Sequence, residues 1–105
     1  MKSDAITELA FSDLKLRFHT PNALTRWRVE TLLVKEPVTV EWIRAFTQDD
    51  IFVDVGANVG VYSILAAKLA RCRVYAFEPM LSNCVVLAQN ILSNDLSDLV
   101  TVEPC

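Results

Sequence analysis

The spacing of apolar residues changes near residue 51 of the chain. Upstream, apolar and charged residues alternate over residues 14–18, which is the period of a half-buried strand, and a short helix is expected after Pro37. Residues 51–53 and residues 74–77 are instead apolar at consecutive positions. Runs of this kind are typical of parallel strands that are covered on both faces.

Two helical patterns separate these apolar runs from one another and from a third predicted strand at residues 99–102. The first pattern has apolar residues at i, i+3, i+4 and i+7, namely Tyr62, Leu65, Ala66 and Leu69. The second repeats that spacing with Cys84, Leu87, Ala88 and Ile91. Short right-handed crossovers between the strands then predict a parallel sheet with both helices on one face.

The sequence therefore predicts an α/β fold, the amino-terminal half of a doubly wound, Rossmann-like parallel sheet. Residues 1–50 are expected to form a lead-in, a strand plus a helix that pack on the sheet, and residues 51–105 the β-α-β-α-β half-domain. Two helices can cover only one face of such a sheet. About half of a doubly wound domain is then absent, so we expect either a truncated chain or a homodimer that covers the open face.

Composition narrows the expected location and partners. The formal net charge of the 105 residues is −3, which argues against nucleic acid or an anionic membrane surface as a partner. The three cysteines form no Cys-x-x-Cys pair, so neither a disulfide framework nor a metal site is predicted. Polar residues follow Met1, and no apolar run approaches about 18 residues, so a cytoplasmic protein is expected.

The run FVDVGANVGVY, at residues 52–62, has the character of a ligand-binding loop. Ligands of open parallel sheets lie beyond the carboxyl ends of the strands, and the first strand ends at Asp54. Gly56 and Gly60 permit a tight turn and let a flat, polar ligand contact the main chain. The alternative is that the two glycines serve only the turn and the packing of the helix.

The same loop argues against a dinucleotide. The Gly-x-Gly-x-x-Gly fingerprint would need glycine at positions 58 and 61, where the chain has Asn58 and Val61. S-adenosylmethionine contains adenosine but no phosphate, so these side chains would not crowd it. Asp54 then lies where a carboxylate can meet the ammonium group of the amino-acid tail. Glu78, at the end of the second strand, lies where a carboxylate can accept both ribose hydroxyls.

The runs FVDVGANVGVYSILAA and VYAFEPMLSNCVVLAQNILSND resemble the FkbM family of S-adenosylmethionine-dependent methyltransferases, as does KEPVTVEWIRAF upstream. The resemblance covers roughly residues 25–102. It implies a cofactor loop and a ribose clamp on the following residues: Asp54, Gly56, Asn58, Gly60 and Glu78. It also implies O-methylation of a hydroxyl on a sugar or another small metabolite. The domain of that family continues beyond a third strand, which leaves activity of these 105 residues alone an open question.

No catalytic base is predicted. His19 continues the polar side of its strand and is expected at the surface, and Tyr62 is expected in the core. Glu36 either points toward the site or caps the helix that follows it. Two alternative functions stay open: a non-catalytic nucleotide-binding or interaction module, and an NAD-dependent oxidoreductase, which Asn58 and Val61 disfavour.

Overall fold

The computed structural model describes residues 5–105, apart from the side chains of residues 32 and 33. Its elements, in chain order, are β1 (Ile6–Phe11), β2 (Leu14–His19), α1 (Ala23–Lys35), α2 (Pro37–Arg44), β3 (Ile51–Val55), α3 (Val61–Ala70), β4 (Arg73–Phe77), α4 (Leu81–Ser93) and β5 (Val100–Glu103). Strands β1 and β2 form an antiparallel hairpin, and β3, β4 and β5 form a parallel sheet in that order. The predicted α/β fold with a parallel sheet is confirmed.

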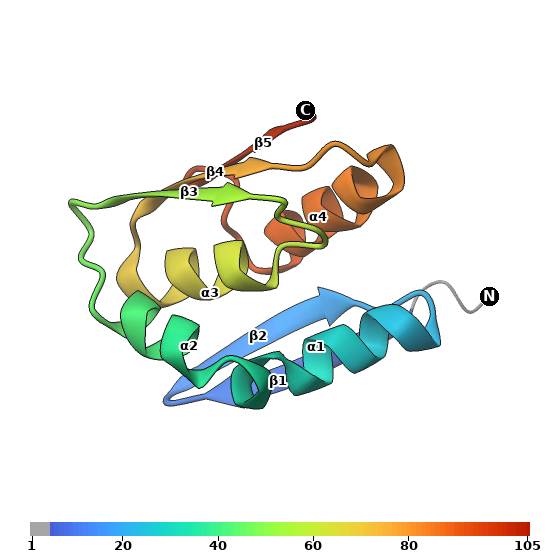
Figure 1. The fold of residues 1–105 in the computed structure, drawn as a ribbon, viewed down its shortest axis with the longest axis horizontal. Coiled ribbons are helices and arrows are strands. Elements are labelled where there is room, and N and C mark those ends of the chain that lie inside the picture. The colour runs from blue at the N-terminus through green and yellow to red at the C-terminus, as the bar shows by residue number, and fades with distance from the viewer. Residues whose placement is uncertain (1–4) are drawn as a thin grey trace.

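The elements are stacked in layers (Figure 1). Helices α3 and α4 cover one face of the parallel sheet, as predicted, and β2 contacts the far side of both helices. Helix α1 packs against β1, and α2 packs against α3. Helix α3 is thus covered on two sides, which agrees with five consecutive buried residues along it: Ser63, Ile64, Leu65, Ala66 and Ala67. A helix that is apolar around most of its circumference needs such cover.

The lead-in differs from its prediction in two respects. It contains a hairpin and two helices rather than one strand and one helix, and its hairpin packs on α3 and α4 rather than on the sheet. Helix α1 begins because the Oδ1 atom of Asn22 accepts hydrogen bonds from the N–H and the hydroxyl of Thr25, each 2.9 Å long. Residues 1–4 of the predicted lead-in lie outside the described residues.

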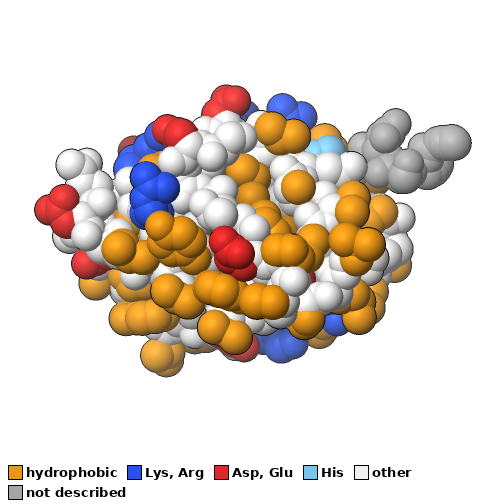
Figure 2. All heavy atoms as spheres, turned by 90° about the horizontal axis from the view of Figure 1, so that it is seen from above, with side chains coloured by type: hydrophobic (Ala, Val, Ile, Leu, Met, Phe, Trp, Pro, Cys, Tyr) orange, Lys and Arg blue, Asp and Glu red, His pale blue; other side chains and the backbone are white. Residues whose placement is uncertain are grey.

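One face of the parallel sheet is open. The inward residues of β3 and β4, such as Phe52 and Val74, are buried against the helices. The outward residues of β3 are exposed: Ile51, Val53 and Val55. Figure 2 looks onto the molecule from this side and shows hydrophobic side chains gathered across it. The prediction that two helices cover only one face is confirmed.

Within residues 5–105, the helices are all too short or too polar to cross a membrane. Cys72 and Cys84 are buried as free thiols, and Cys105 is exposed.

The apolar stripe of α4 is confirmed at Cys84, Leu87 and Ile91, whereas its predicted fourth member, Ala88, is exposed.

A valine-to-alanine substitution should lower the free energy of unfolding by different amounts on the two faces of the sheet. Val74→Ala removes a fully buried side chain and should lower the free energy of unfolding by about 2 kcal/mol or more. Val53→Ala, on the open face of the neighbouring strand, should lower it by less than about 1 kcal/mol. Urea denaturation of both variants checks this. Equal losses would mean that the open face is covered in solution.

Candidate functional site

A cavity of about 230 Å³ opens beside the carboxyl end of β3. One wall is the loop that joins β3 to α3, with the lining residues Gly56, Ala57, Asn58 and Val59. The other wall belongs to α1 and the residue that follows it, with the lining residues Arg28, Thr31, Lys35 and Glu36. The lead-in therefore completes a cavity that the half-domain alone would leave open on one side.

The loop turns sharply because three of its residues have positive φ angles: Gly56 at 73°, Asn58 at 60° and Gly60 at 91°. The N–H groups of Gly56 and Ala57 both donate to the carbonyl of Phe77, at the end of β4, over 2.8 and 3.0 Å. These bonds hold the backbone in a left-handed conformation that glycine adopts readily and that residues with a Cβ atom disfavour.

The two glycines of the loop have different surroundings. A Cβ atom added to Gly56 would meet no atom within 4 Å, so the main chain there is open toward the cavity. A Cβ atom added to Gly60 would collide with Cδ1 of Leu87, a fully buried side chain of α4. Gly56 thus leaves room for a ligand, whereas Gly60 allows the loop to approach α4.

Glu78 lies behind the loop and is 5% exposed. Its Oε1 accepts the N–H of Asn58 over 2.7 Å, and its Oε2 accepts the N–H of Met80 and the amide of Asn83 over 3.0 and 3.2 Å. Burial acts to raise the pKa of Glu78, but these three hydrogen bonds outweigh it and hold the pKa below its ordinary value. The carboxylate is therefore kept ionised, and it anchors the loop.

Asp54 is half-buried at the end of β3 and faces the cavity. Its Oδ2 accepts the hydroxyl of Ser63, in α3, over 2.6 Å. Burial raises the pKa of the Asp54 carboxyl, the bond from Ser63 opposes that rise, and the charge of Glu78 adds to it. A partly desolvated carboxylate with one polar partner is well suited to meet a cation inside the cavity.

The wall formed by the lead-in brings charged groups to the loop. A guanidinium nitrogen of Arg28 donates to Oδ1 of Asn58 over 3.0 Å, and the Tyr62 hydroxyl donates to the Glu36 carboxylate over 2.5 Å. Glu36 precedes α2 but its side chain makes no capping hydrogen bond there, so it points toward the site. Burial, together with the bond to Glu36, raises the pKa of Tyr62 above its ordinary range.

Sequence reasoning missed Arg28 and Lys35 as cavity residues. Their spacing of seven places them on one face of a helix, but the segment showed no clear period and was not recognised as helical. His19, the histidine considered as a base, is only half-buried on β2 and does not line the cavity. Its Nε2 is 2.8 Å from the Ser93 hydroxyl instead.

Of the five residues predicted to bind a cofactor, three line the cavity: Asp54, Gly56 and Asn58. Gly60 and Glu78 do not, because Gly60 packs on Leu87 and Glu78 is turned toward the main chain behind the loop. The cavity holds two cationic side chains, Arg28 and Lys35, and two carboxylates, Asp54 and Glu36. Such a balanced set suits a zwitterionic ligand, and the open main chain of Gly56 suits a flat one.

No family model matches the chain. A curated relative, a tRNA (guanine(37)-N(1))-methyltransferase from Dictyostelium discoideum, is 32% identical over 63 residues, which make up 60% of this chain and 14% of the relative. The chain thus spans a small part of the length of that relative.

Several solved structures share the fold. P. horikoshii TYW2 in complex with MeSAdo aligns with a TM-score of 0.64 and 19% identity over 96% of this chain and 36% of that one. M. jannaschii TYW2 in complex with AdoMet (S-adenosylmethionine) aligns with a TM-score of 0.61 and 18% identity over 92% and 42%. Precorrin-6y C5,15-methyltransferase from Geobacter metallireducens GS-15 aligns with a TM-score of 0.59 and 22% identity over 67% and 37%. The fold of the chain is therefore the Rossmann-like α/β fold that these structures share.

The comparisons contradict one prediction made from composition. The net charge was taken to exclude nucleic acid, yet the curated relative is a tRNA methyltransferase, and an rRNA methylase from Streptococcus thermophilus shares the fold with a TM-score of 0.59 and 16% identity over 66% of this chain and 38% of that one. The reason is that net charge averages over a chain, whereas a binding surface depends on local charge. All ten Lys and Arg residues lie within the first 73 positions.

The raised pKa of Asp54 predicts that its ionised carboxylate lowers the free energy of unfolding at neutral pH. The protonated carboxyl is favoured by the fold, so this stabilisation is fully present below the ordinary pKa of 3.8 and is lost as the pH rises through the folded pKa. Asp54→Asn should therefore unfold at a higher urea concentration than the unsubstituted chain at neutral pH, and the difference should shrink as the pH is lowered.

Asp98→Asn is the matched control, because Asp98 is exposed and the same change there should leave the midpoint of unfolding unchanged. A lower midpoint for Asp54→Asn at neutral pH would contradict the prediction and would mean that the bond from Ser63 outweighs the burial of the carboxylate.

Proposed function

We propose that the chain is the cofactor-binding part of an S-adenosylmethionine-dependent methyltransferase. The observation that carries this proposal is the cavity at the carboxyl end of β3, where the open main chain of Gly56 faces two cations and two carboxylates. The position is the one at which open α/β sheets bind their ligands. The likeness in sequence to a tRNA methyltransferase, and in fold to a methyltransferase and to a protein solved in complex with AdoMet, supports it.

In this proposal each residue of the cavity wall recognises a different part of the cofactor. Asp54 accepts a hydrogen bond from the ammonium group of the amino-acid tail, and Arg28 pairs with the carboxylate of that tail. Gly56 leaves its main chain free for the adenosine. Asn58, Gly60 and the buried Glu78 keep the loop in its conformation.

The predicted ribose clamp at Glu78 stays a prediction. A carboxylate offers about four acceptor sites, and three of those on Glu78 already accept hydrogen bonds from Asn58, Met80 and Asn83. A contact with a ribose hydroxyl would use the remaining acceptor site of the carboxylate or would require one of these three hydrogen bonds to break.

When bound, S-adenosylmethionine supplies a methyl group on a sulfonium, which an acceptor atom takes by direct displacement. The contribution of the chain is alignment and exclusion of water. Tyr62 is not the base that accepts a proton from the acceptor, because its raised pKa keeps the phenol protonated. It serves instead as a donor that orients Glu36 at the cavity wall.

For the acceptor, we propose a nucleotide within RNA. The curated relative acts on tRNA according to its name, and this supports the choice. The P. horikoshii TYW2 alignment covers 96% of this chain, so it includes most of the lead-in as well as the half-domain. O-methylation of a hydroxyl on a small metabolite, membership of the FkbM family and a cytoplasmic location stay predictions.

A methyl-transfer assay separates the candidate functions. The chain is incubated with S-adenosylmethionine that carries a labelled methyl group, together with either bulk tRNA and rRNA or a mixture of hydroxylated sugars. Label in RNA supports the proposed acceptor, and label in the sugars alone would replace it with the hydroxyl acceptor. Binding of the cofactor without transfer to either would mean that these residues hold the cofactor but do not complete an active methyltransferase by themselves.

Calorimetric titration of S-adenosylmethionine into the chain tests the cofactor site itself. Gly56→Val should weaken binding by more than about tenfold, or about 1.4 kcal/mol, because the valine side chain occupies the open space beside the loop. Unchanged affinity in this variant would falsify the assignment of the cavity.

Ser12→Val is a control for a valine at a positive φ in that experiment. Ser12 has a φ of 55° in the turn of the β1–β2 hairpin and already carries a Cβ atom there, so valine adds only the cost of a branched side chain at that φ. Ser12 does not line the cavity, and the control should bind the cofactor as the unsubstituted chain does.

A further inference from the structure

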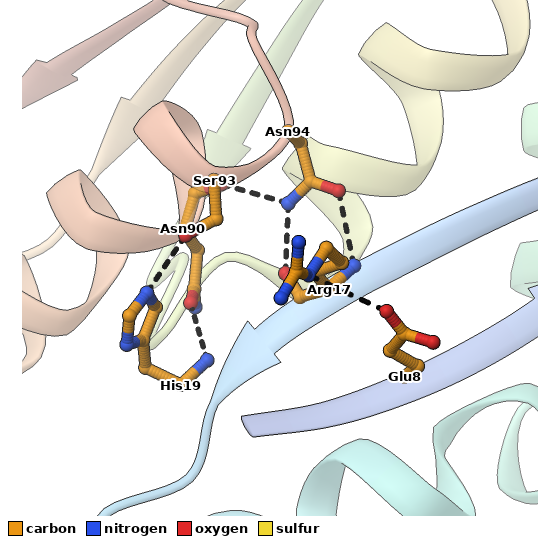
Figure 3. A network of polar contacts seen from close by, with 6 residues as sticks. All are labelled: Glu8, Arg17, His19, Asn90, Ser93 and Asn94. Carbon is orange, nitrogen blue, oxygen red and sulfur yellow. Dashed lines mark hydrogen bonds and ion pairs between the residues drawn. The ribbon is translucent and has the colours of Figure 1, made fainter. Parts of the chain in front are cut away.

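Two buried asparagines, Asn90 on α4 and Asn94 at the C-cap of that helix, lie four residues apart and face the β1–β2 hairpin (Figure 3). Asn90 is fully buried and Asn94 is 3% exposed. Asparagine is mostly found at protein surfaces, and a buried amide requires partners for its donors and its acceptor. The partners of these two residues differ, and the difference separates their roles.

Asn94 bonds to β2 and to its own helix. Its Oδ1 accepts the N–H of Arg17 over 3.0 Å, and its Nδ2 donates to the carbonyl of Arg17 over 2.7 Å. Its Nδ2 also lies 2.7 Å from the carbonyl of Asn90. The amide thus pairs with the free edge of β2 in the way that a neighbouring strand would, and it holds the hairpin on α4.

Asn90 connects the hairpin to the loop that lines the cavity. Its Oδ1 accepts the N–H of His19, at the end of β2, over 2.7 Å. Its Nδ2 donates to the carbonyl of Val59 over 2.7 Å. Val59 follows Asn58 in the loop and lines the cavity. A single buried amide therefore spans from β2, through α4, to the candidate cofactor site.

We propose that Asn90 is a positioning residue for cofactor binding. Glu78 holds the loop through the N–H of Asn58, and Asn90 holds the adjacent residue through the carbonyl of Val59. Without Asn90, that carbonyl loses its partner, and the Gly60 end of the loop keeps only the main-chain bonds of Gly60 to Ala57 and Ile64 and its packing on Leu87. This inference rests on the proposed function, because it concerns the affinity of the same cavity for S-adenosylmethionine.

The two asparagines provide a matched test. Asn90→Leu and Asn94→Leu each replace a buried amide, one in α4 and one at its C-cap, and each leaves one main-chain N–H and one main-chain carbonyl without their partner. Both variants should lose stability. At a temperature where both remain folded, Asn90→Leu should bind S-adenosylmethionine about tenfold or more weakly, whereas Asn94→Leu should stay within about threefold of the unsubstituted chain.

Amide hydrogen exchange supplies a second measurement. If Asn90 only stabilised the fold as a whole, its replacement would not speed exchange in the loop more than elsewhere. The amides of Asn58 and Gly60 should exchange faster in Asn90→Leu than in Asn94→Leu, relative to amides of β5 in the same sample. If Asn90→Leu does not fold, Asn90→Ser keeps a smaller polar side chain and is used in its place. Equal affinities and equal loop exchange in the two variants would overturn the proposal.

The outcomes also separate this inference from the proposed function. Failure of the unsubstituted chain to bind S-adenosylmethionine would defeat the proposed function, and the exchange comparison would still report whether Asn90 holds the loop. Binding by the unsubstituted chain that both asparagine variants retain equally would defeat only the role of Asn90.

Discussion

The candidate site depends on the loop between β3 and α3, whose main-chain groups are held by other elements. The N–H groups of Gly56 and Ala57 bond to the end of β4, the N–H of Asn58 bonds to Glu78, and the carbonyl of Val59 bonds to Asn90. Asn58 bears the cost of a side chain at a positive φ, and the two glycines lose more backbone freedom on folding than other residues do, so the loop keeps this shape only while its partners are in place. The shape of the cavity therefore depends on β4 and α4 as well as on the loop.

The sequence predicted the half-domain because its signals there are local and redundant. Apolar runs mark β3 and β4, a repeated helical spacing marks α3 and α4, and the glycine loop lies between the first strand and the first helix. Position 56 could be assigned to a ligand-facing loop from residue type, and position 58 from the family resemblance. The roles of Gly60 and Glu78 could not, because they follow from contacts with Leu87 and with the main chain behind the loop.

The lead-in was harder to predict because tertiary contacts, rather than its own pattern, determine its structure. The burial of β1 alternates along the strand, but its residue types do not follow that alternation, because Ile6 is exposed and Thr7 is half-buried. Helix α1 depends on the cap at Asn22 and on packing against β1. The burial of Asn90 was not predicted, because the apolar spacing placed Ala88 on the buried face of α4 and hydrophobic periodicity does not identify a buried amide. Residues that connect layers are the ones that a one-dimensional pattern does not reveal.

Net charge misled the choice of partner because none of the four acids after residue 73 lines the cavity. The four acids after residue 73 give that part of the chain a charge of −4, with no Lys or Arg to offset them. Asp95 and Asp98 follow α4, and a connection from helix to strand in a parallel sheet lies at the edge opposite the carboxyl ends of the strands. Glu78 is buried and bonded internally. The charge that a ligand meets is instead set by Arg28, Lys35 and two carboxylates, so the cavity is balanced although the chain is acidic.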